Sequence, residues 1–288
     1  MSSTRDDTSV VYCTDDSYWM PLYVSLQSLL ENNPDRAFSV HIVCESIDPT
    51  FDKHAKKLTT AFQLNLRYLQ ADASAVKSFP LFGGLPGAVY YRLFVGSLLP
   101  ECRDRTLYLD CDTVVLDRLD RLFDFDLGDS IIGAVDDAVP WVGEKLGVTP
   151  YFNSGMMLID LHMWRKERIE EAALRFIDTE AHRIYCPDQD VLNAILDGKW
   201  KQLPNIYNFQ TGHCDAHAQG RPEINPAIAH FVTGNKPWLK RSKHPFKPEF
   251  WDVLRRTPYW PYREPDRKVF GMPRKLRLWM EKSGLIRS

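Results

Sequence analysis

The stretch LYLDCDT, residues 107–113, indicates the fold, because it ends an apolar strand with two carboxylates. In an extended segment, residues two apart share a face. Asp110 and Asp112 therefore reach one point, while Cys111 points the other way into the core. Two such carboxylates bind a hard divalent cation and leave coordination positions free for phosphate oxygens. The alternative is a strand that simply ends in solvated acids.

Strands and helices alternate around this stretch, which is typical of an α/β domain with a mostly parallel sheet flanked by helices. The sequence contains no internal repeat and no low-complexity linker, so we expect one domain, residues 1–262, followed by a tail, residues 263–288. Predicted strands cover 9–14, 38–45, 66–69, 107–112, 130–135, 155–161 and 227–232. Predicted helices cover 50–62, 88–98, 162–180 and 188–197, with another carrying Trp19, Tyr23, Leu26 and Leu30 on one face.

The composition is that of a globular protein: 288 residues, 44% apolar and 26% charged, with a mean hydropathy of −0.33. No apolar run reaches membrane-spanning length, and the first ten residues lack the pattern of a signal peptide. We therefore expect the protein in the cytoplasm. That compartment keeps thiols reduced, and the six cysteines show no CxxC spacing. They are Cys13, Cys44, Cys102, Cys111, Cys186 and Cys214.

Charge is spread unevenly along the chain, whose net value is −2. From Arg263 to Ser288, eight basic residues stand against three acidic ones, a local charge of +5. Apolar residues including Trp279 mix with these basic residues, as in a short interfacial helix. We therefore predict contact of the tail with an anionic membrane, at its cytoplasmic face. The alternative is a helix packed on the domain with a solvated basic face. No nucleic acid partner is predicted.

Ligands in open α/β sheets bind outside the carboxyl ends of the strands, and the first polar cluster at such a place is Thr14 to Tyr18. A carboxylate, Asp15, and an aromatic ring, Tyr18, suit a nucleobase bound along its edge and face. Acidic and hydroxyl residues also serve there as ordinary helix caps. The glycine-rich G-x-G-x-x-G of dinucleotide folds is absent, so we expect no backbone cradle for phosphates.

Two further clusters suit sugar hydroxyls. Asn153, Ser154 and Gly155 begin the strand GMMLIDL and offer several donors and acceptors, although a simple turn has the same composition. Pro187-Asp188-Gln189-Asp190 starts a helix, where proline and acids are good capping residues. Two acids and an amide are more than capping requires.

The fourth cluster is HFVTGNKPW, residues 230–238. His230 ends an apolar strand and is a candidate third metal ligand. Imidazole beside two carboxylates suits Mn²⁺, with Mg²⁺ as the alternative ion. A histidine at a strand end is otherwise a polar surface group. Gly234 and Lys236 follow closely, and a lysine is a common partner of phosphate.

Taken in order, TDDSY, YRL, LYLDCD, FNSGMMLIDL, PDQDVLN and HFVTGNKPW resemble glycosyltransferase family 8 over residues 9 to about 255. These are retaining GT-A enzymes that include bacterial lipopolysaccharide galactosyl- and glucosyltransferases and glycogenin. The resemblance implies a GT-A fold with a Rossmann-like nucleotide half. It also implies Mn²⁺, a UDP-sugar donor and a saccharide or glycolipid acceptor.

The resemblance also implies roles for particular residues. Asp110, Asp112 and His230 hold the metal, and Lys236 contacts the diphosphate. Members commonly carry glycine three residues after the histidine, whereas Thr233 stands there and Gly234 comes one later. The catalytic residues are Gln189, beside the anomeric carbon, and Asp188. The remaining donor contacts are Cys13, Thr14, Asp15 and Tyr18 at the uridine, Arg92, Asn153 and Asp188 at the sugar, and Cys111, Ser154 and Gly234.

Chemically, a cation and Lys236 stabilise a leaving diphosphate without a general acid. Retention comes from front-face attack or from a covalent intermediate, and an uncharged Gln189 is a poor nucleophile. We favour front-face attack, with UDP helping to take the acceptor proton.

Other functions remain to be compared. Within the family, the alternative is a glycogenin-like or protein-directed glucosyltransferase. DCDTVV also matches the nucleophile motif of haloacid-dehalogenase-type phosphatases, although the acidic run at 128–137 follows too closely for that fold. A catalytically silent sugar- or nucleotide-binding protein is the third alternative. The sequence leaves galactose against glucose, the acceptor and the oligomeric state open.

Overall fold

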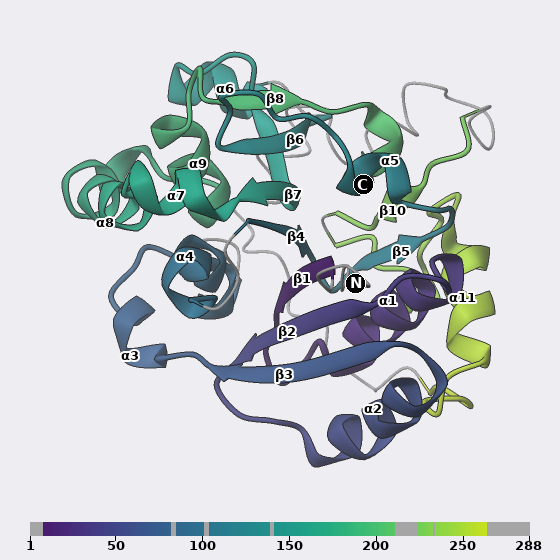
Figure 1. Ribbon diagram of the computed structural model, residues 1–288. Coiled ribbons are helices and arrows are strands. Elements are labelled where there is room, and N and C mark those ends of the chain that lie inside the picture. The colour runs from purple at the N-terminus through teal and green to yellow at the C-terminus, as the bar shows by residue number, and fades with distance from the viewer. Residues whose placement is uncertain are drawn as a thin grey trace, which may run out of the picture.

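Figure 1 shows the computed structural model, a central sheet between two groups of helices. The structure describes residues 8–81, 85–100, 104–138, 141–210, 224–232 and 234–263. Outside these ranges lie Cys102, Cys214, Thr233 and the part of the predicted tail that follows Arg263. Cys13, Cys44, Cys111 and Cys186 are free thiols. No helix within the described ranges is long and apolar enough to cross a membrane.

Seven strands form the main sheet, in the order β3-β2-β1-β4-β7-β6-β8. Neighbouring strands pair in parallel, except that β7 runs antiparallel to both β4 and β6. The mostly parallel sheet predicted from the alternation of elements is thus confirmed. The strands are β1 (Thr8–Cys13), β2 (Phe38–Cys44), β3 (Leu64–Gln70), β4 (Arg105–Leu109), β6 (Ile132–Asp136), β7 (Phe152–Asp160) and β8 (Trp200–Gln202).

Both faces of the sheet are covered by helices (Figure 1). Alternate residues of β1 enter different cores: Val10 and Tyr12 join one, and Val11 the other, as side-chain alternation along a strand requires. The first core includes residues of α1 (Trp19–Asn32) and α2 (Pro49–Ala61). The second includes η1 (Gly87–Phe94), α4 (Val95–Leu98), α7 (Leu161–Lys166), α8 (Ile169–Glu180) and α9 (Pro187–Ile195). The other helices of the described residues are α3 (Ala73–Val76), α5 (Asp120–Phe123), α6 (Trp141–Leu146), η2 (Ala181–Arg183), η3 (Asn205–Tyr207) and α11 (Lys247–Arg255).

The helix predicted at 88–98 is instead a 3₁₀ helix, η1, followed by one turn of α4. Three consecutive residues, Tyr90, Tyr91 and Arg92, are buried there and contact different parts of the chain. The Tyr90 hydroxyl donates to the Pro80 carbonyl and the Tyr91 hydroxyl to Glu45. These contacts with other parts of the chain, and not local propensity, decide the conformation of this segment.

A second, three-stranded sheet of order β5-β10-β9 was not predicted as a sheet. Its strands are β5 (Thr113–Val115), β9 (Phe209–Gln210) and β10 (Ile228–His230). Runs this short carry no readable periodicity. β10 pairs antiparallel with β5, so that His230 lies opposite Thr113. This pairing brings His230 next to the acidic segment that precedes β5.

The segment Asp110–Asp112 is a turn between β4 and β5, and not the extended end of a strand. The Thr113 hydroxyl donates to the Asp110 carbonyl at 2.9 Å and stabilises the turn. Cys111 is buried as predicted, and its thiol donates to the Cys13 carbonyl at 3.2 Å.

Candidate active site

The polar residues predicted as site residues lie together at one edge of the main sheet. β1 and β4 end there, and because β7 is antiparallel to β4, β7 begins there. The Asp110 backbone N–H donates to the Gly155 carbonyl at 2.8 Å and continues the pairing of β4 with β7 past the end of β4. The carboxyl ends of parallel strands are where α/β folds bind ligands.

A pocket of about 300 Å³ lies at this edge. Every residue to which the family resemblance assigns a role lines it except Gly234, which is exposed nearby. The predicted residues at the pocket are Cys13, Thr14, Asp15, Tyr18, Arg92, Asp110, Cys111, Asp112, Asn153, Ser154, Asp188, Gln189, His230 and Lys236. Segments far apart in the chain therefore meet around one cavity.

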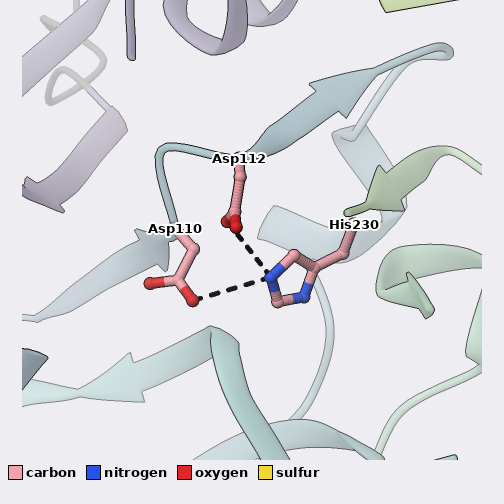
Figure 2. Close-up of side chains that lie close together, drawn as sticks. All are labelled: Asp110, Asp112 and His230. Atoms are coloured by element: carbon pink, nitrogen blue, oxygen red, sulfur yellow. Dashed lines mark ion pairs between the residues drawn. The ribbon is translucent and has the colours of Figure 1, made fainter. Parts of the chain in front are cut away.

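Asp110, Asp112 and His230 form a group that we call the acidic cluster (Figure 2). His230 Nε2 lies 3.6 Å from Asp110 Oδ2 and 3.3 Å from Asp112 Oδ1. One ligand atom from each residue falls within 4.8 Å of the others. Two carboxylate oxygens and an imidazole nitrogen at this spacing fit a single divalent cation.

Cations orient both carboxylates of the acidic cluster. Asp110 Oδ1 accepts from Arg92 Nη2 at 2.9 Å and from the Tyr108 hydroxyl at 2.7 Å. Asp112 Oδ2 is paired with Lys236, whose ammonium group also donates to the Phe231 carbonyl at 2.8 Å. The other oxygen of each carboxylate is left facing His230.

Burial alone would raise the pKa of Asp112, but the charge of Lys236 outweighs it and holds that pKa well below its usual range. Burial likewise acts to lower the pKa of Lys236, and the charge of Asp112 reverses this and raises it. Asp112 and Lys236 thus keep their opposite charges inside the protein.

Arg92 connects the acidic cluster to the start of α9. Its Nε is 3.1 Å from Asp188 Oδ2, and its Nη1 donates to the Ser154 carbonyl at 3.0 Å. The guanidinium also stacks 4.6 Å from the centre of the Tyr108 ring. Burial raises the pKa of Asp188, although the charge of Arg92 opposes that rise.

A second group, which we call the amide network, consists of Asn153, Gln189, Asn208 and Asp137. Gln189 Oε1 accepts from the Ser154 backbone N–H and from Asn153 Nδ2, each at 3.1 Å. Gln189 Nε2 donates to Asp137 Oδ2 at 2.9 Å. The side-chain amide of Gln189 is therefore fixed in orientation at the pocket wall.

The acids of PDQD have different surroundings. Asp190 lies outside the pocket and is fully buried. Its carboxylate accepts from the Tyr151 hydroxyl at 2.6 Å and from the backbone N–H groups of Tyr185 and Cys186 at 2.6 and 2.7 Å. These contacts hold the chain that enters α9. Asp190 therefore has a structural role, which is the alternative given above for the acids at the start of this helix.

At the predicted nucleobase end, Asp15 Oδ1 accepts from the Ser17 backbone N–H and hydroxyl at 2.7 and 2.6 Å. Asp15 therefore shapes the loop before α1, whose N-cap position is occupied by Tyr18 without a side-chain capping hydrogen bond. The Tyr18 ring packs edge-on against Trp238, with ring centres 5.7 Å apart. Burial raises the pKa of Tyr18 to about 12, so its hydroxyl is neutral at physiological pH.

Three further residues at this edge are not predicted from the sequence: Tyr108, Asp137 and Asn208. Asp137 follows β6, and the rule that polar groups at strand ends bind ligands would have selected it. Asn208 lies between the short elements η3 and β9, and no pattern in the sequence marks it.

Comparisons with known proteins identify a family and a fold that the chain is similar to. The model of glycosyl transferase family 8 matches residues 9–242. General stress protein A of Bacillus subtilis is 32% identical over 266 residues, covering 86% of this chain and 93% of that protein. A lipopolysaccharide 1,2-glucosyltransferase of Escherichia coli K12 is 26% identical over 271 residues, covering 89% and 80%.

Among solved structures, the galactosyltransferase LgtC in complex with donor and acceptor sugar analogs has the same fold, with a TM-score of 0.80. The two sequences are 24% identical, and the match covers 88% of this chain and 98% of that one. The predicted GT-A architecture is therefore confirmed.

Proposed function

The chain belongs to glycosyl transferase family 8, and from that premise we propose that it transfers galactose or glucose from a UDP-sugar to a hydroxyl group of a saccharide acceptor, with retention. The observation that carries this proposal is the convergence of Asp110, Asp112 and His230 beside Lys236 in one pocket. Membership of this family also excludes the alternative that DCDTVV is the nucleophile motif of a haloacid-dehalogenase-type phosphatase.

The acidic cluster fits Mn²⁺, or Mg²⁺ as the alternative, because its inner oxygens and imidazole nitrogen face a common point. A nucleoside diphosphate is an anion, and carboxylates alone would repel it. When bound, the cation supplies positive charge close to the leaving diphosphate. Asp110, Asp112 and His230 are the residues that would hold it.

The side chains around the acidic cluster have complementary tasks in this proposal. Lys236 provides a second positive charge for the diphosphate, so the leaving group requires no general acid. Asp15 and Tyr18, with Cys13 or Thr14, line the uridine end of the pocket. Arg92, Asn153 and Asp188 lie where the sugar hydroxyls are expected, with Gln189 beside them.

Front-face attack is the route to retention that the side chains favour. Gln189 is uncharged and therefore a poor nucleophile. Asp190 is fully buried, with both oxygens accepting hydrogen bonds from the protein. The acceptor hydroxyl then attacks from the side of the departing UDP, which takes up its proton.

For the acceptor, we propose a lipopolysaccharide-type or other surface glycan. The support comes from the E. coli relative named as a lipopolysaccharide glucosyltransferase. A Salmonella typhimurium relative is named as a lipopolysaccharide 1,3-galactosyltransferase, and is 26% identical over 273 residues. A glycogenin-like or protein-directed acceptor is the alternative. We place the enzyme in the cytoplasm, at the membrane surface where a glycolipid acceptor would be found.

A screen of UDP-sugars for hydrolysis, with Mn²⁺ and then with EDTA, tests this function. We expect hydrolysis of UDP-galactose or UDP-glucose in Mn²⁺ and none in EDTA. Once an acceptor is known, NMR of the early product should show an α-linkage from the UDP-α-sugar. Failure to hydrolyse any UDP-sugar, despite binding one, would instead indicate a silent binding protein, and a β-linked product would contradict retention.

A further inference from the structure

Asn208 is fully buried and does not line the pocket, yet it joins the two groups of the site. Its Nδ2 donates to Asn153 Oδ1 at 3.0 Å. Its Oδ1 lies 2.9 Å from His230 Nδ1, on the side of the ring opposite the carboxylates. A continuous path of hydrogen bonds thus runs from the amide network to the acidic cluster.

The backbone of β7 determines which atom donates and which accepts in each hydrogen bond of this path. The Gly155 backbone N–H, which can only donate, is 3.1 Å from Asn153 Oδ1. This contact assigns the oxygen of the Asn153 amide and leaves its nitrogen facing Gln189 Oε1 and Asp137 Oδ2, each at 3.1 Å. The Ser154 backbone N–H fixes the Gln189 amide in the same way, at 3.1 Å.

The orientation of the Asn208 amide is fixed by its contact with Asn153. Because Asn153 presents an oxygen, Asn208 must present its nitrogen to it, and the Asn208 oxygen is left for His230. An amide oxygen only accepts, so His230 must carry a proton on Nδ1. A neutral histidine with that proton has a bare Nε2, the atom that faces Asp110 and Asp112.

We propose that Asn208 is a positioning residue that holds His230 in the tautomer whose Nε2 lone pair faces the metal site. Two backbone N–H groups, on Ser154 and Gly155, determine the amide orientations through which this proton is placed. The consequence for metal binding rests on the proposed function, whereas the tautomer itself does not. Partners of ligating histidines in general contribute 10- to 100-fold in metal affinity.

The test compares the wild type with Asn208→Leu and Asn208→Asp. Leucine is close in size to asparagine and makes neither hydrogen bond, whereas aspartate keeps an acceptor for His230 Nδ1–H. ¹⁵N NMR of the metal-free proteins, at a pH where the imidazole is neutral, gives the tautomer, with the His230 signal assigned by its absence in His230→Gln. Calorimetric titration with Mn²⁺ alone, without nucleotide, gives the affinity.

Asn33→Leu is the matched control. Asn33 is also buried, and its amide bonds the Leu29 carbonyl and the Leu119 backbone N–H, away from the pocket. This variant should lose stability, because the buried Leu119 N–H loses its acceptor. It should keep both the tautomer of His230 and the affinity for Mn²⁺.

We expect the Nδ1–H tautomer in the wild type and in Asn208→Asp, and its loss in Asn208→Leu with 10- to 100-fold weaker Mn²⁺ binding. An Nε2–H tautomer in the wild type would overturn the proposal, as would a folded Asn208→Leu with unchanged tautomer or affinity. If Asn208→Leu does not fold, loss of the tautomer in Asn208→Asp overturns it and retention supports it. A wild type that binds no Mn²⁺ refutes the metal assignment alone, and the tautomer still decides the role of Asn208.

Discussion

The acidic cluster and the amide network share one edge of the sheet, but they satisfy their polar atoms in different ways. In the acidic cluster, one oxygen of each carboxylate is bound by Arg92 or Lys236, and the other faces His230. In the amide network, both the oxygen and the nitrogen of Asn153, Gln189 and Asn208 bond the protein. The first arrangement leaves one oxygen of each carboxylate available to the cation of the proposed function, whereas the second fixes the orientation of its side-chain amides.

The largest effect should come from neutralising the acidic cluster. We expect Asp110→Asn or Asp112→Asn to lower UDP-sugar turnover in Mn²⁺ by at least 100-fold. Losing a single donor to a leaving oxyanion costs about 2.7–4 kcal/mol, and losing the cation should cost no less. Steady-state rates with and without EDTA measure this, with circular dichroism to confirm folding.

Asp117→Asn serves as the control, since Asp117 is exposed and its side chain bonds only the Arg118 backbone N–H among the contacts described. Its rate should equal that of the wild type. A near wild-type rate in either cluster variant would show that the carboxylates do not hold a catalytic cation.

The next effect concerns the pH dependence of stability, and it comes from His244, near the acidic cluster. His244 Nδ1 accepts from the Phe246 backbone N–H, and its ring centre lies 4.5 Å from that of Phe231. Burial, with the charge of Lys236 acting in the same direction, lowers the pKa of His244 to about 4. The unfolded chain, with a pKa near 6.5, therefore takes up this proton first as the pH falls.

His244 should thus destabilise the folded protein progressively from pH 6.5 down to 4, by about 3 kcal/mol in total. Above pH 6.5 it contributes no such loss. In His244→Asn, which keeps an acceptor for Phe246, the free energy of unfolding should fall less over this range by about that amount. Urea unfolding at pH 7, 5.5 and 4.5 gives the free energy of unfolding of both proteins. An equal loss in the two proteins as the pH falls would contradict the lowered pKa of His244.

A smaller effect is expected where the two groups touch, at Gly155. A Cβ atom built there would lie 2.2 Å from His230 Cε1 and 2.6 Å from Asp110 Oδ2. Gly155→Ala should therefore separate two members of the acidic cluster, weaken Mn²⁺ binding at least tenfold and lower stability by about 1–3 kcal/mol. Calorimetry and urea unfolding provide the two measurements.

Gly96→Ala is also crowded, though less so, and distant from the acidic cluster, since its Cβ would lie 2.7 Å from Trp164 Cδ1 and 2.8 Å from Glu170 Oε1. It should lose comparable stability and keep its Mn²⁺ affinity. If both alanine variants bound Mn²⁺ like the wild type, the close approach of β7 to the acidic cluster would have no functional meaning.

The smallest effect on catalysis should come from the tail. Both the acidic cluster and the amide network lie within residues 8–263, so deletion of 264–288 should leave UDP-sugar hydrolysis unchanged. It should release the protein from anionic vesicles, because each basic residue near such a surface contributes about 1 kcal/mol. Unchanged vesicle binding after deletion would refute the tail proposal. The same holds if the full-length chain does not bind at low salt.

The same two groups show what the sequence reveals. Asp110, Asp112 and His230 stand at the ends of apolar runs, and a general rule about strand ends selects them. Asn208 has no such context, because the strand beside it spans only Phe209 and Gln210. Its position depends on pairing between β9 and β10, which are separated in the chain. The turn at Asp110–Asp112 and the 3₁₀ helix at Arg92 likewise depend on partners that local propensity does not encode.

The short strand β10 has a further consequence for folding. It is three residues long, and it delivers His230 to a site whose other ligands follow the much larger sheet. A cation held by all three residues would therefore act as a cross-link between the small sheet and the large one. Its binding free energy would add to the stability of the native state through mass action. Metal supply would then determine how firmly the C-terminal part of the domain stays docked, as well as how fast the enzyme works.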